Sequence, residues 1–267
     1  MVTVITGGAG GIGLACARRL GGEVILADLP GERLDAAAEQ LRAEGIDARA
    51  IPCDVSDAIQ VAALARPFRA LVHTAGLAPP LATDPRAVLD VNLAGTARLL
   101  DAFEPHAAGG SVAVCIASLA GHRASAARGD AQLRRPLEPD LYERLGAPPS
   151  VLTAYSLSKR GVILECRRRA AAWGARGARI VSVSPGLVAD TTIGEAAAGI
   201  FAGAYADQAA VKRAGTAKDI AGVVAFLAGE DAAYVTGCDL LVDGGVLADV
   251  DHHQAEDAAA MWHAAAN

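Results

Sequence analysis

Eight residues near the N-terminus, Thr6-Gly7-Gly8-Ala9-Gly10-Gly11-Ile12-Gly13, connect two segments of different character. The preceding segment, Val2–Thr6, is short and β-branched and predicts a buried strand, whereas Leu14–Leu20 contains good helix formers. Glycines in such a turn let the backbone approach a pyrophosphate, and the helix N-terminus directs N–H groups towards it. The strand–turn–helix placement therefore predicts a dinucleotide site rather than an ordinary glycine-rich turn.

The rest of the chain alternates between apolar runs and helix-forming segments. Continuous apolar strands that alternate with helices indicate a parallel sheet covered on both faces. We expect an α/β, single-domain (1–267), Rossmann-like doubly wound fold with a seven-stranded, mostly parallel sheet. The further strands are predicted at 24–27, 48–53, 70–74, 111–117, 179–183 and 239–242, and the further helices at 32–43, 85–103, 154–173 and 219–227.

Composition excludes several other classes of protein. Of the 267 residues 52% are hydrophobic and 20% are charged, which supports a packed core and argues against disorder. The net charge of −6 argues against binding to nucleic acid, which requires a basic face. We find neither an apolar run of membrane length nor a positively charged leader, and the five cysteines are scattered. We therefore expect a cytoplasmic protein without disulfides or a zinc site.

Asp28 ends the second predicted strand, fifteen residues after Gly13. A carboxylate there can accept hydrogen bonds from both hydroxyls of an adenosine ribose and would repel a 2′-phosphate. No cation precedes Gly11 in the turn, so we expect NAD(H) to be preferred over NADP(H). Arg33 is a possible counter-argument, but we expect it on a solvated helix face. Asp54 ends the third strand at the same edge, where a simple turn aspartate is the alternative.

Tyr155 and Lys159 stand four positions apart at the start of a predicted helix, so their side chains share one face. A free tyrosine has a pKa of ~10 and is a poor base at neutral pH. A nearby ammonium favours the phenolate and lowers that pKa, and the tuned phenol can then exchange a proton with an alcohol. The pair therefore predicts acid–base chemistry, against the alternative of an accidental pair on a helix.

Several motifs now occur in a fixed order along the chain: Thr6-Gly7-x-x-x-Gly11-Ile12-Gly13, Asp54-Val55, Asn92, Ser118, Tyr155-x-x-x-Lys159 and Pro185-Gly186. This order resembles the classical, single-domain type of the short-chain dehydrogenase/reductase family. The resemblance extends over nearly the whole chain, as far as Val242-Asp243-Gly244-Gly245. Each motif is weak alone, and the combination is highly specific.

The resemblance implies a catalytic set of four residues. Tyr155 would be the general acid/base, Lys159 would lower its pKa and hold the nicotinamide ribose, and Ser118 would hydrogen-bond the substrate oxygen. Asn92 would keep a water in a proton relay to the lysine. The residues expected to contact the cofactor are Gly7, Gly10, Gly11, Ile12, Gly13, Asp28, Leu29, Asp54, Val55, Thr74, Ala75, Gly76, Tyr155, Lys159, Pro185, Gly186, Val188 and Thr191.

The sequence departs from the family pattern at three places. Thr74-Ala75-Gly76 replaces the usual Asn-Ala-Gly, and we expect the threonine to do little harm. Asp190-Thr191-Thr192 places the usual threonine one position late, so either threonine is a candidate. Tyr155 follows Ser118 after 37 positions, so 119–153 contains an insertion. This insertion, with Arg168–Gly174, is similar to the bacterial 3α-hydroxysteroid dehydrogenase/carbonyl reductase branch.

Two further segments carry expectations about substrate and assembly. The resemblance identifies 187–214 as a substrate lid; its apolar Ile193–Val211 part favours an apolar or cyclic ketone or secondary alcohol, against an ordinary surface helix pair. The C-terminal tail 246–267 contains three of the histidines, and we expect a polar tail rather than a metal site. The family resemblance alone implies a homodimer or homotetramer.

Three functions remain open from the sequence. The first is an NAD(H)-dependent oxidoreductase that interconverts a secondary alcohol and a ketone on an apolar, cyclic substrate. The second is a tailoring enzyme of the same family, which acts on an imine, an enone or a cyclic alcohol intermediate. The third is a sensor or scaffold that binds NAD(H) without turnover; it would have degenerate catalytic residues, and here all four positions are filled.

Overall fold

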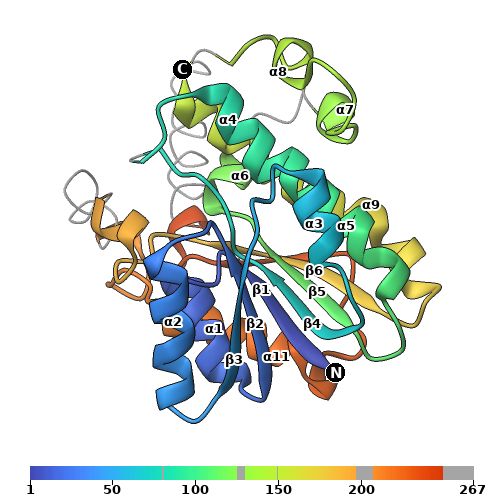
Figure 1. Cartoon of the computed structure of the whole chain (residues 1–267). Coiled ribbons are helices and arrows are strands. Elements are labelled where there is room, and N and C mark those ends of the chain that lie inside the picture. The colour runs from blue at the N-terminus through green and yellow to red at the C-terminus, as the bar shows by residue number, and fades with distance from the viewer. Residues whose placement is uncertain (80, 125–129, 149, 197–206, 249–267) are drawn as a thin grey trace, which may run out of the picture.

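A single parallel sheet forms the centre of the protein (Figure 1). The computed structural model describes residues 1–79, 81–124, 130–148, 150–196 and 207–248. The strand order is β3-β2-β1-β4-β5-β6-β7, and all six pairings are parallel, as the sequence predicts. The order reverses between β1 and β4, which places a crevice at the carboxyl ends of these strands. The strands are β1 (Val2–Thr6), β2 (Glu23–Asp28), β3 (Asp47–Pro52), β4 (Phe68–His73), β5 (Val112–Ile116), β6 (Arg179–Pro185) and β7 (Asp239–Val242).

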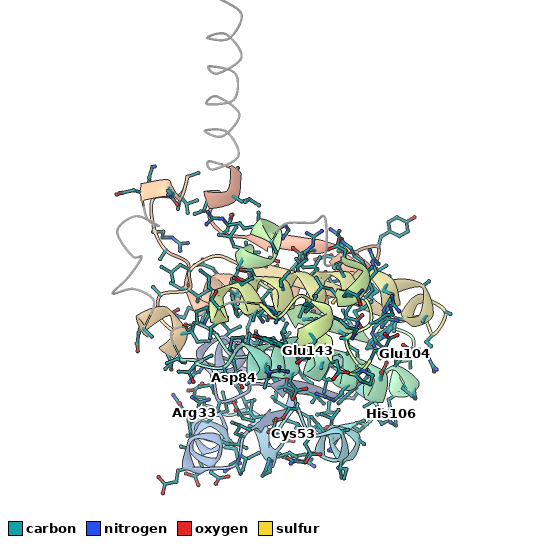
Figure 2. All side chains as sticks on the ribbon, turned by 90° about the horizontal axis from the view of Figure 1, so that it is seen from above. Arg33, Cys53, Asp84, Glu104, His106 and Glu143 are labelled. Carbon is teal, nitrogen blue, oxygen red and sulfur yellow. The ribbon has the colours of Figure 1, made fainter. Side chains whose placement is uncertain are left out.

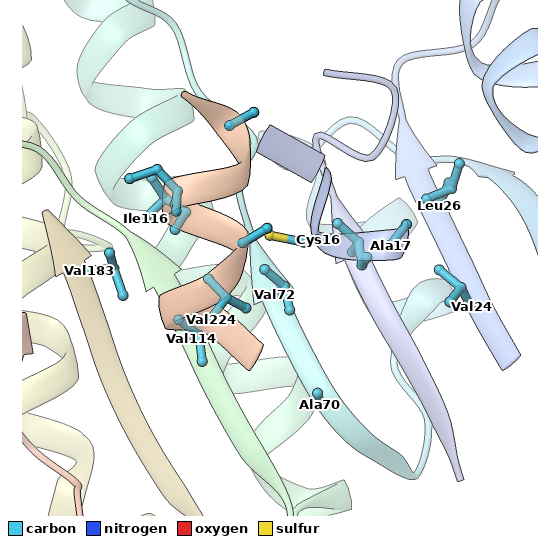
Figure 3. Close-up of a cluster of buried hydrophobic side chains, with 14 of the residues drawn as sticks. Cys16, Ala17, Val24, Leu26, Ala70, Val72, Val114, Ile116, Val183 and Val224 are labelled. Atoms are coloured by element: carbon cyan, nitrogen blue, oxygen red, sulfur yellow. The ribbon is translucent and has the colours of Figure 1, made fainter. Parts of the chain in front are cut away.

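Helices cover both faces of the sheet. On one face lie α1 (Gly11–Leu20), α2 (Glu32–Ala43) and α11 (Ala217–Ala228), and Figure 3 shows their contact with the strands, where Cys16 and Val224 meet Val72 and Val114. On the other face lie α3 (Ala58–Leu64), α5 (Gly95–Phe103) and the long α9 (Val151–Gly174). Because side chains alternate along a strand, Leu71 enters the second core while Val72 enters the first.

The helix predicted over 85–103 is divided in the structure. It consists of α4 (Pro85–Leu89), a π-helical turn (Asp90–Ala94) and α5. π-turns are rare within helices and occur most often at functional sites. Gly95 follows the turn, and a Cβ there would lie 3.1 Å from Val55, so the close approach of the segment after β3 favours glycine. The prediction of one helix over 85–103 is confirmed, but apolar periodicity cannot reveal a change of helical pitch, so the π-turn was not predicted.

Short helices complete the structure. The α3 helix, absent from the sequence prediction, is capped by the Asp57 carboxylate, which accepts bonds from the backbone N–H groups of Ile59 and Gln60. The described parts of 119–153 form three helices that pack on or near α9. The additional elements are α6 (Leu119–Arg123), α7 (Asp130–Leu133), α8 (Leu141–Arg144) and the 3-10 turns Glu104–His106 and Glu230–Ala232.

The predicted lid and tail are described only in part. Residues 197–206, which contain Phe201 and Tyr205, and the histidine-bearing residues 249–267 lie outside the described residues. Among the helices that are described, none has both the length and the apolar character needed to cross a bilayer.

Candidate active site

A cavity of about 530 Å³ opens at the carboxyl ends of β1, β4, β5 and β6. This is the crevice where open α/β sheets bind ligands. It brings together most of the residues that the sequence singles out. Its lining includes Gly7, Gly10, Gly11, Ile12, Gly13, Thr74, Gly76, Ser118, Tyr155, Lys159, Pro185, Gly186, Val188 and Thr191.

The glycine turn leaves space that any side chain would fill. Gly7 has φ +67°, and a Cβ there would lie 2.6 Å from the backbone nitrogen of Ala75. A Cβ on Gly13 would lie 2.4 Å from the carbonyl oxygen of Gly7, and one on Gly11 would lie 2.8 Å from Thr191. The turn therefore exposes bare backbone at the N-terminus of α1, which is the surface that a pyrophosphate requires. The residues present fit a nicotinamide dinucleotide.

Asp28 lies beside this turn, at the end of β2. Its carboxylate accepts bonds from the backbone N–H groups of Ala9 (3.0 Å) and Leu29 (2.8 Å). As the sequence predicts, Arg33 is exposed on α2 (Figure 2). It also lines the cavity, and its guanidinium lies 3.6 Å from the Asp28 carboxylate. The first turn of α2 directs Arg33 back towards the end of β2, a proximity that sequence separation does not reveal.

Thr74 replaces the family's usual asparagine without loss of the connection between strands. Its hydroxyl donates to the carbonyl of Thr6 at 2.8 Å and lies 3.2 Å from that of Gly7. The side chain thus joins the ends of β4 and β1 directly beneath the glycine turn. This agrees with the expectation that threonine does little harm at this position.

Ser118, Tyr155 and Lys159 converge on the same side of the cavity. The Ser118 hydroxyl caps α6 by accepting from the backbone N–H of Ala120, and it lines the cavity together with the phenol of Tyr155. The Lys159 ammonium donates to the carbonyl of Ile116 at 2.9 Å and lies 5.9 Å from the centre of the Tyr155 ring. A phenol, a hydroxyl and an ammonium are thus held at one end of β5.

The pKa values of this group differ from the sequence prediction. Burial raises the pKa of the Tyr155 phenol, and the nearby Ser118 hydroxyl only partly offsets that effect. Burial also lowers the pKa of Lys159 to about 8. The sequence predicts that the lysine lowers the pKa of the tyrosine, but in this structure desolvation is the larger effect on the phenol. Tyr155 is therefore a phenol, not a phenolate, at neutral pH.

Asn92 lies in the π-helical turn and is 1% exposed. Its side-chain oxygen accepts from the backbone N–H of Leu77 at 2.7 Å, and its amide donates to the Leu77 carbonyl and to the Ser158 hydroxyl. It therefore fastens the segment after β4 to α9. A Cβ on Gly76 would lie 3.0 Å from the Asn92 side chain and 3.4 Å from the Lys159 ammonium, so both groups lie close to this glycine.

A few predicted cofactor contacts lie outside the cavity lining. The Asp54 carboxylate accepts from the backbone and hydroxyl of Ser56, as in a turn, and Val55 is buried in the core. Leu29 is 60% exposed. Thr191 lines the cavity with its neighbour Thr192, but its hydroxyl caps the local backbone between Val188 and Gly194. Asp28, Leu29, Asp54, Val55, Ala75 and Asn92 do not line the cavity.

The outer wall of the cavity was predicted from the sequence only where it belongs to the segment 187–214. It is apolar and comes from three separate segments: the loop after β4, the start of α9 and the segment after β6. Single apolar residues in loops have no periodic signal, so only the fold brings them together. The residues are Leu77, Ala78, Pro79, Leu81, Leu152, Leu187 and Ile193.

Fold and site together define an oxidoreductase that uses a nicotinamide dinucleotide. Residues 1–129 match the family model described as short chain dehydrogenase, and residues 145–247 match the model described as Enoyl-(Acyl carrier protein) reductase. The chain belongs to the short-chain dehydrogenase/reductase family. The family prediction is confirmed, as is the prediction that the protein is an enzyme of the alcohol dehydrogenase/ketone reductase class.

Curated relatives are similar over nearly their full lengths. The "Short-chain dehydrogenase/reductase bsc3" of Alternaria brassicicola is 33% identical over 92% of this chain and 96% of the relative. The "Cis-4-hydroxycyclohexanecarboxylate dehydrogenase" of Sinomonas cyclohexanicum is 34% identical over 92% and 96%. The "7alpha-hydroxysteroid dehydrogenase" of Bacteroides fragilis is 30% identical over 92% and 93%. A hydroxysteroid enzyme is therefore among the relatives.

A solved structure also matches most of the chain. A short chain dehydrogenase from Burkholderia cenocepacia J2315, in complex with NADP, has a TM-score of 0.75 and 26% identity over 91% of this chain and 96% of the other.

Proposed function

We propose that this enzyme interconverts a secondary alcohol and a ketone with NAD(H), on a neutral, apolar and cyclic substrate. One observation carries the proposal: Tyr155, Ser118 and Lys159 share a cavity with the glycine turn at the N-terminus of α1. The four-residue set Asn92, Ser118, Tyr155 and Lys159 would provide the acid–base chemistry. A small-molecule substrate is the expected partner, and we propose a single-domain chain that forms a homo-oligomer in the cytoplasm.

Two groups of residues in and beside the cavity would bind the dinucleotide. Gly7, Gly11 and Gly13 would hold the pyrophosphate against backbone N–H groups, and Asp28 would accept bonds from the adenosine ribose. Pro185, Gly186 and Val188 also line the cavity, and they would orient the nicotinamide. When bound, the dinucleotide supplies or accepts the hydride. The remaining chemistry, which is transfer of a proton and stabilisation of charge, belongs to the protein.

In the direction of ketone reduction, the Ser118 hydroxyl and the Tyr155 phenol would both donate to the carbonyl oxygen. Charge develops on that oxygen as the reaction proceeds, and preorganised donors stabilise it. Tyr155 then releases its proton to the nascent alkoxide, and the Lys159 ammonium stabilises the phenolate that remains. Its raised pKa suits Tyr155 to this role, because the phenol retains the proton at neutral pH until the alkoxide forms.

The outer wall supports an apolar substrate. Leu77, Leu81, Leu152 and Ile193 present only hydrocarbon to the space beside Tyr155. The relatives named for a hydroxycyclohexanecarboxylate and a hydroxysteroid support a cyclic alcohol as the substrate class. The test is a panel of cyclic ketones and matched linear ketones with NADH. We expect the cyclic compounds to have the higher kcat/KM; silence across the panel with tight NADH binding would instead favour a sensor.

Cofactor preference is the first quantitative test. Removal of the carboxylate in Asp28→Ala removes its repulsion of a 2′-phosphate and leaves Arg33 free to pair with that group. We expect the kcat/KM ratio of NADPH to NADH to rise roughly a hundredfold, since like-charge contacts cost several kcal/mol and 1.4 kcal/mol is tenfold.

Arg33→Ala is the matched control for this test. Alone, Arg33→Ala should leave kcat/KM with NADH within about threefold. Arg33 is 67% exposed and its ion pair with Asp28 is long, at 3.6 Å, so the pair contributes little. In the Asp28→Ala background it should remove most of the NADPH gain. If wild-type enzyme already prefers NADPH, as the NADP-bound relative allows, our assignment of Asp28 is wrong.

The pKa shifts predict opposite pH profiles for the two directions. Because burial raises the pKa of Tyr155, the proton-donating form persists through neutral pH, and ketone reduction should be flat up to about pH 8. The pKa of Lys159 is about 8, so above pH 8 this residue loses its charge and the rate of ketone reduction should fall. Alcohol oxidation needs the phenolate, which the raised pKa of Tyr155 makes scarce at neutral pH, so the oxidation rate should keep rising with pH above pH 8. An oxidation rate that is greatest at acid pH would contradict the assignment.

A further inference from the structure

His73, the last residue of β4, is 2% exposed and has a partner on each ring nitrogen. Nδ1 lies 2.6 Å from the hydroxyl of Thr6, and Nε2 lies 2.9 Å from the hydroxyl of Thr96. The Thr96 hydroxyl in turn lies 2.6 Å from the backbone carbonyl of Asn92. These contacts form an unbroken chain from the residue before Gly7 to the π-helical turn.

The direction of every bond in this chain is fixed by chemistry. A carbonyl has no hydrogen, so Thr96 must donate its single hydroxyl proton to Asn92. Thr96 can then only accept from His73, which places the imidazole proton on Nε2. Nδ1 is left as an acceptor, and Thr6 donates to it. Burial, together with the charge of Lys159, lowers the pKa of His73 to about 3, so the ring stays neutral and the order of donors does not reverse with pH.

We propose that His73 is a positioning residue, a neutral imidazole that ties the start of the dinucleotide turn to the Asn92 carbonyl and so holds Asn92 in register with Lys159. The inference rests on the proposed function, because it assigns the network a purpose in that reaction. Thr6 immediately precedes Gly7, and the Asn92 side chain and the Lys159 ammonium both lie close to Gly76. This series of hydrogen bonds therefore connects the glycine turn, at one end of the cavity, with the Asn92 segment at the other.

A purely structural core would not need this arrangement. Apolar side chains at positions 6, 73 and 96 would fill the same space without buried polar atoms to satisfy. A polar network selects one arrangement, because any shift leaves a donor or an acceptor unpaired in a low-dielectric interior. The arrangement selected here fixes a backbone carbonyl in a π-turn, where regular helical hydrogen bonding is interrupted. The neutrality of His73 also avoids placing a second positive charge near Lys159.

The test compares Thr96→Val, which keeps the side-chain shape but removes the hydroxyl, with Thr96→Ser, which keeps the hydroxyl. We expect Thr96→Val to lower kcat about tenfold while KM for the ketone and the dissociation constant of NADH stay within about twofold. Thr96→Ser should restore kcat to within about twofold of wild type. A merely structural role would lower the melting temperature of Thr96→Val without changing kcat per folded enzyme, and that result would overturn the proposal.

Thr6→Val removes the hydrogen bond at the other end of this network and allows a double-mutant cycle. If His73 transmits the effect, Thr6→Val with Thr96→Val should lose no more kcat than the more damaging single variant, whereas independent residues would multiply their losses. Multiplied losses would also overturn the proposal. Imidazole ¹⁵N NMR of wild type, with His73→Asn for assignment, should report a neutral ring protonated at Nε2 from pH 5 to 8. A charged ring or the other tautomer would refute the network even if the enzyme's substrate class proved different.

Discussion

Replacement of Tyr155 by phenylalanine is expected to lower kcat about 10³-fold, within the range that general acid–base catalysis contributes. The substitution removes one oxygen, which shares the cavity with Ser118 and would donate the proton to the substrate oxygen. NADH binding should stay within about threefold of wild type, because the glycine turn and the strand ends that would hold the dinucleotide are untouched. Steady-state rates with a cyclic ketone and a fluorescence titration with NADH measure the two quantities.

Tyr142→Phe is the matched control. Tyr142 belongs to α8 in the 119–153 insertion, and its phenol donates to the carbonyl of Pro148 rather than into the cavity. It loses the same atom as Tyr155→Phe, at a cost of about 1 kcal/mol in stability, and kcat should not change. Retained turnover in Tyr155→Phe, or an equal loss in Tyr142→Phe, would mean that the proton comes from another group.

The parts of the site that the sequence predicts share a local signal. Tyr155 and Lys159 are one helical turn apart, and the glycine turn lies between a β-branched run and a helix, so short-range geometry is enough to place them. The positions of the strands along the chain follow from apolar runs, and every predicted strand occurs in the sheet. These features depend on periodicity and on backbone conformations that only glycine allows, which a single sequence displays directly.

The features that were missed depend on contacts between distant segments. Arg33 reaches Asp28 because α2 folds back on β2, and the apolar wall of the cavity is assembled from three segments that are far apart in the sequence. The raised pKa of Tyr155 is a consequence of how deeply the fold buries it, which residue spacing cannot report. Likewise, the sequence shows His73 only as one residue of an otherwise apolar strand. The structure reveals that the hydroxyls of Thr6 and Thr96 contact its two ring nitrogens.

Gly13→Ala is expected to reduce NADH affinity by about a hundredfold and to lower the melting temperature by several degrees. Its Cβ would lie 2.4 Å from the carbonyl oxygen of Gly7 and 2.9 Å from Gly8, and both are backbone atoms of the turn itself. The turn can relieve the overlap only by moving, and overpacking of this kind costs about 1–3 kcal/mol. The displaced turn would no longer present its N–H groups to a pyrophosphate in the required geometry. Calorimetric titration with NADH and thermal unfolding measure the two effects.

Gly222→Ala separates this effect from a general consequence of placing alanine in a helix. Gly222 lies within α11, and a Cβ there would meet no atom within 4 Å, so the substitution should stabilise the protein by about 0.5–1 kcal/mol and leave NADH affinity unchanged. Both variants add one methyl group to a helical glycine, and they differ only in what that methyl meets. If Gly13→Ala bound NADH as tightly as Gly222→Ala, the turn at the start of α1 would not be the pyrophosphate site. The acid–base set at Tyr155 would then serve a substrate that enters without a dinucleotide beside it.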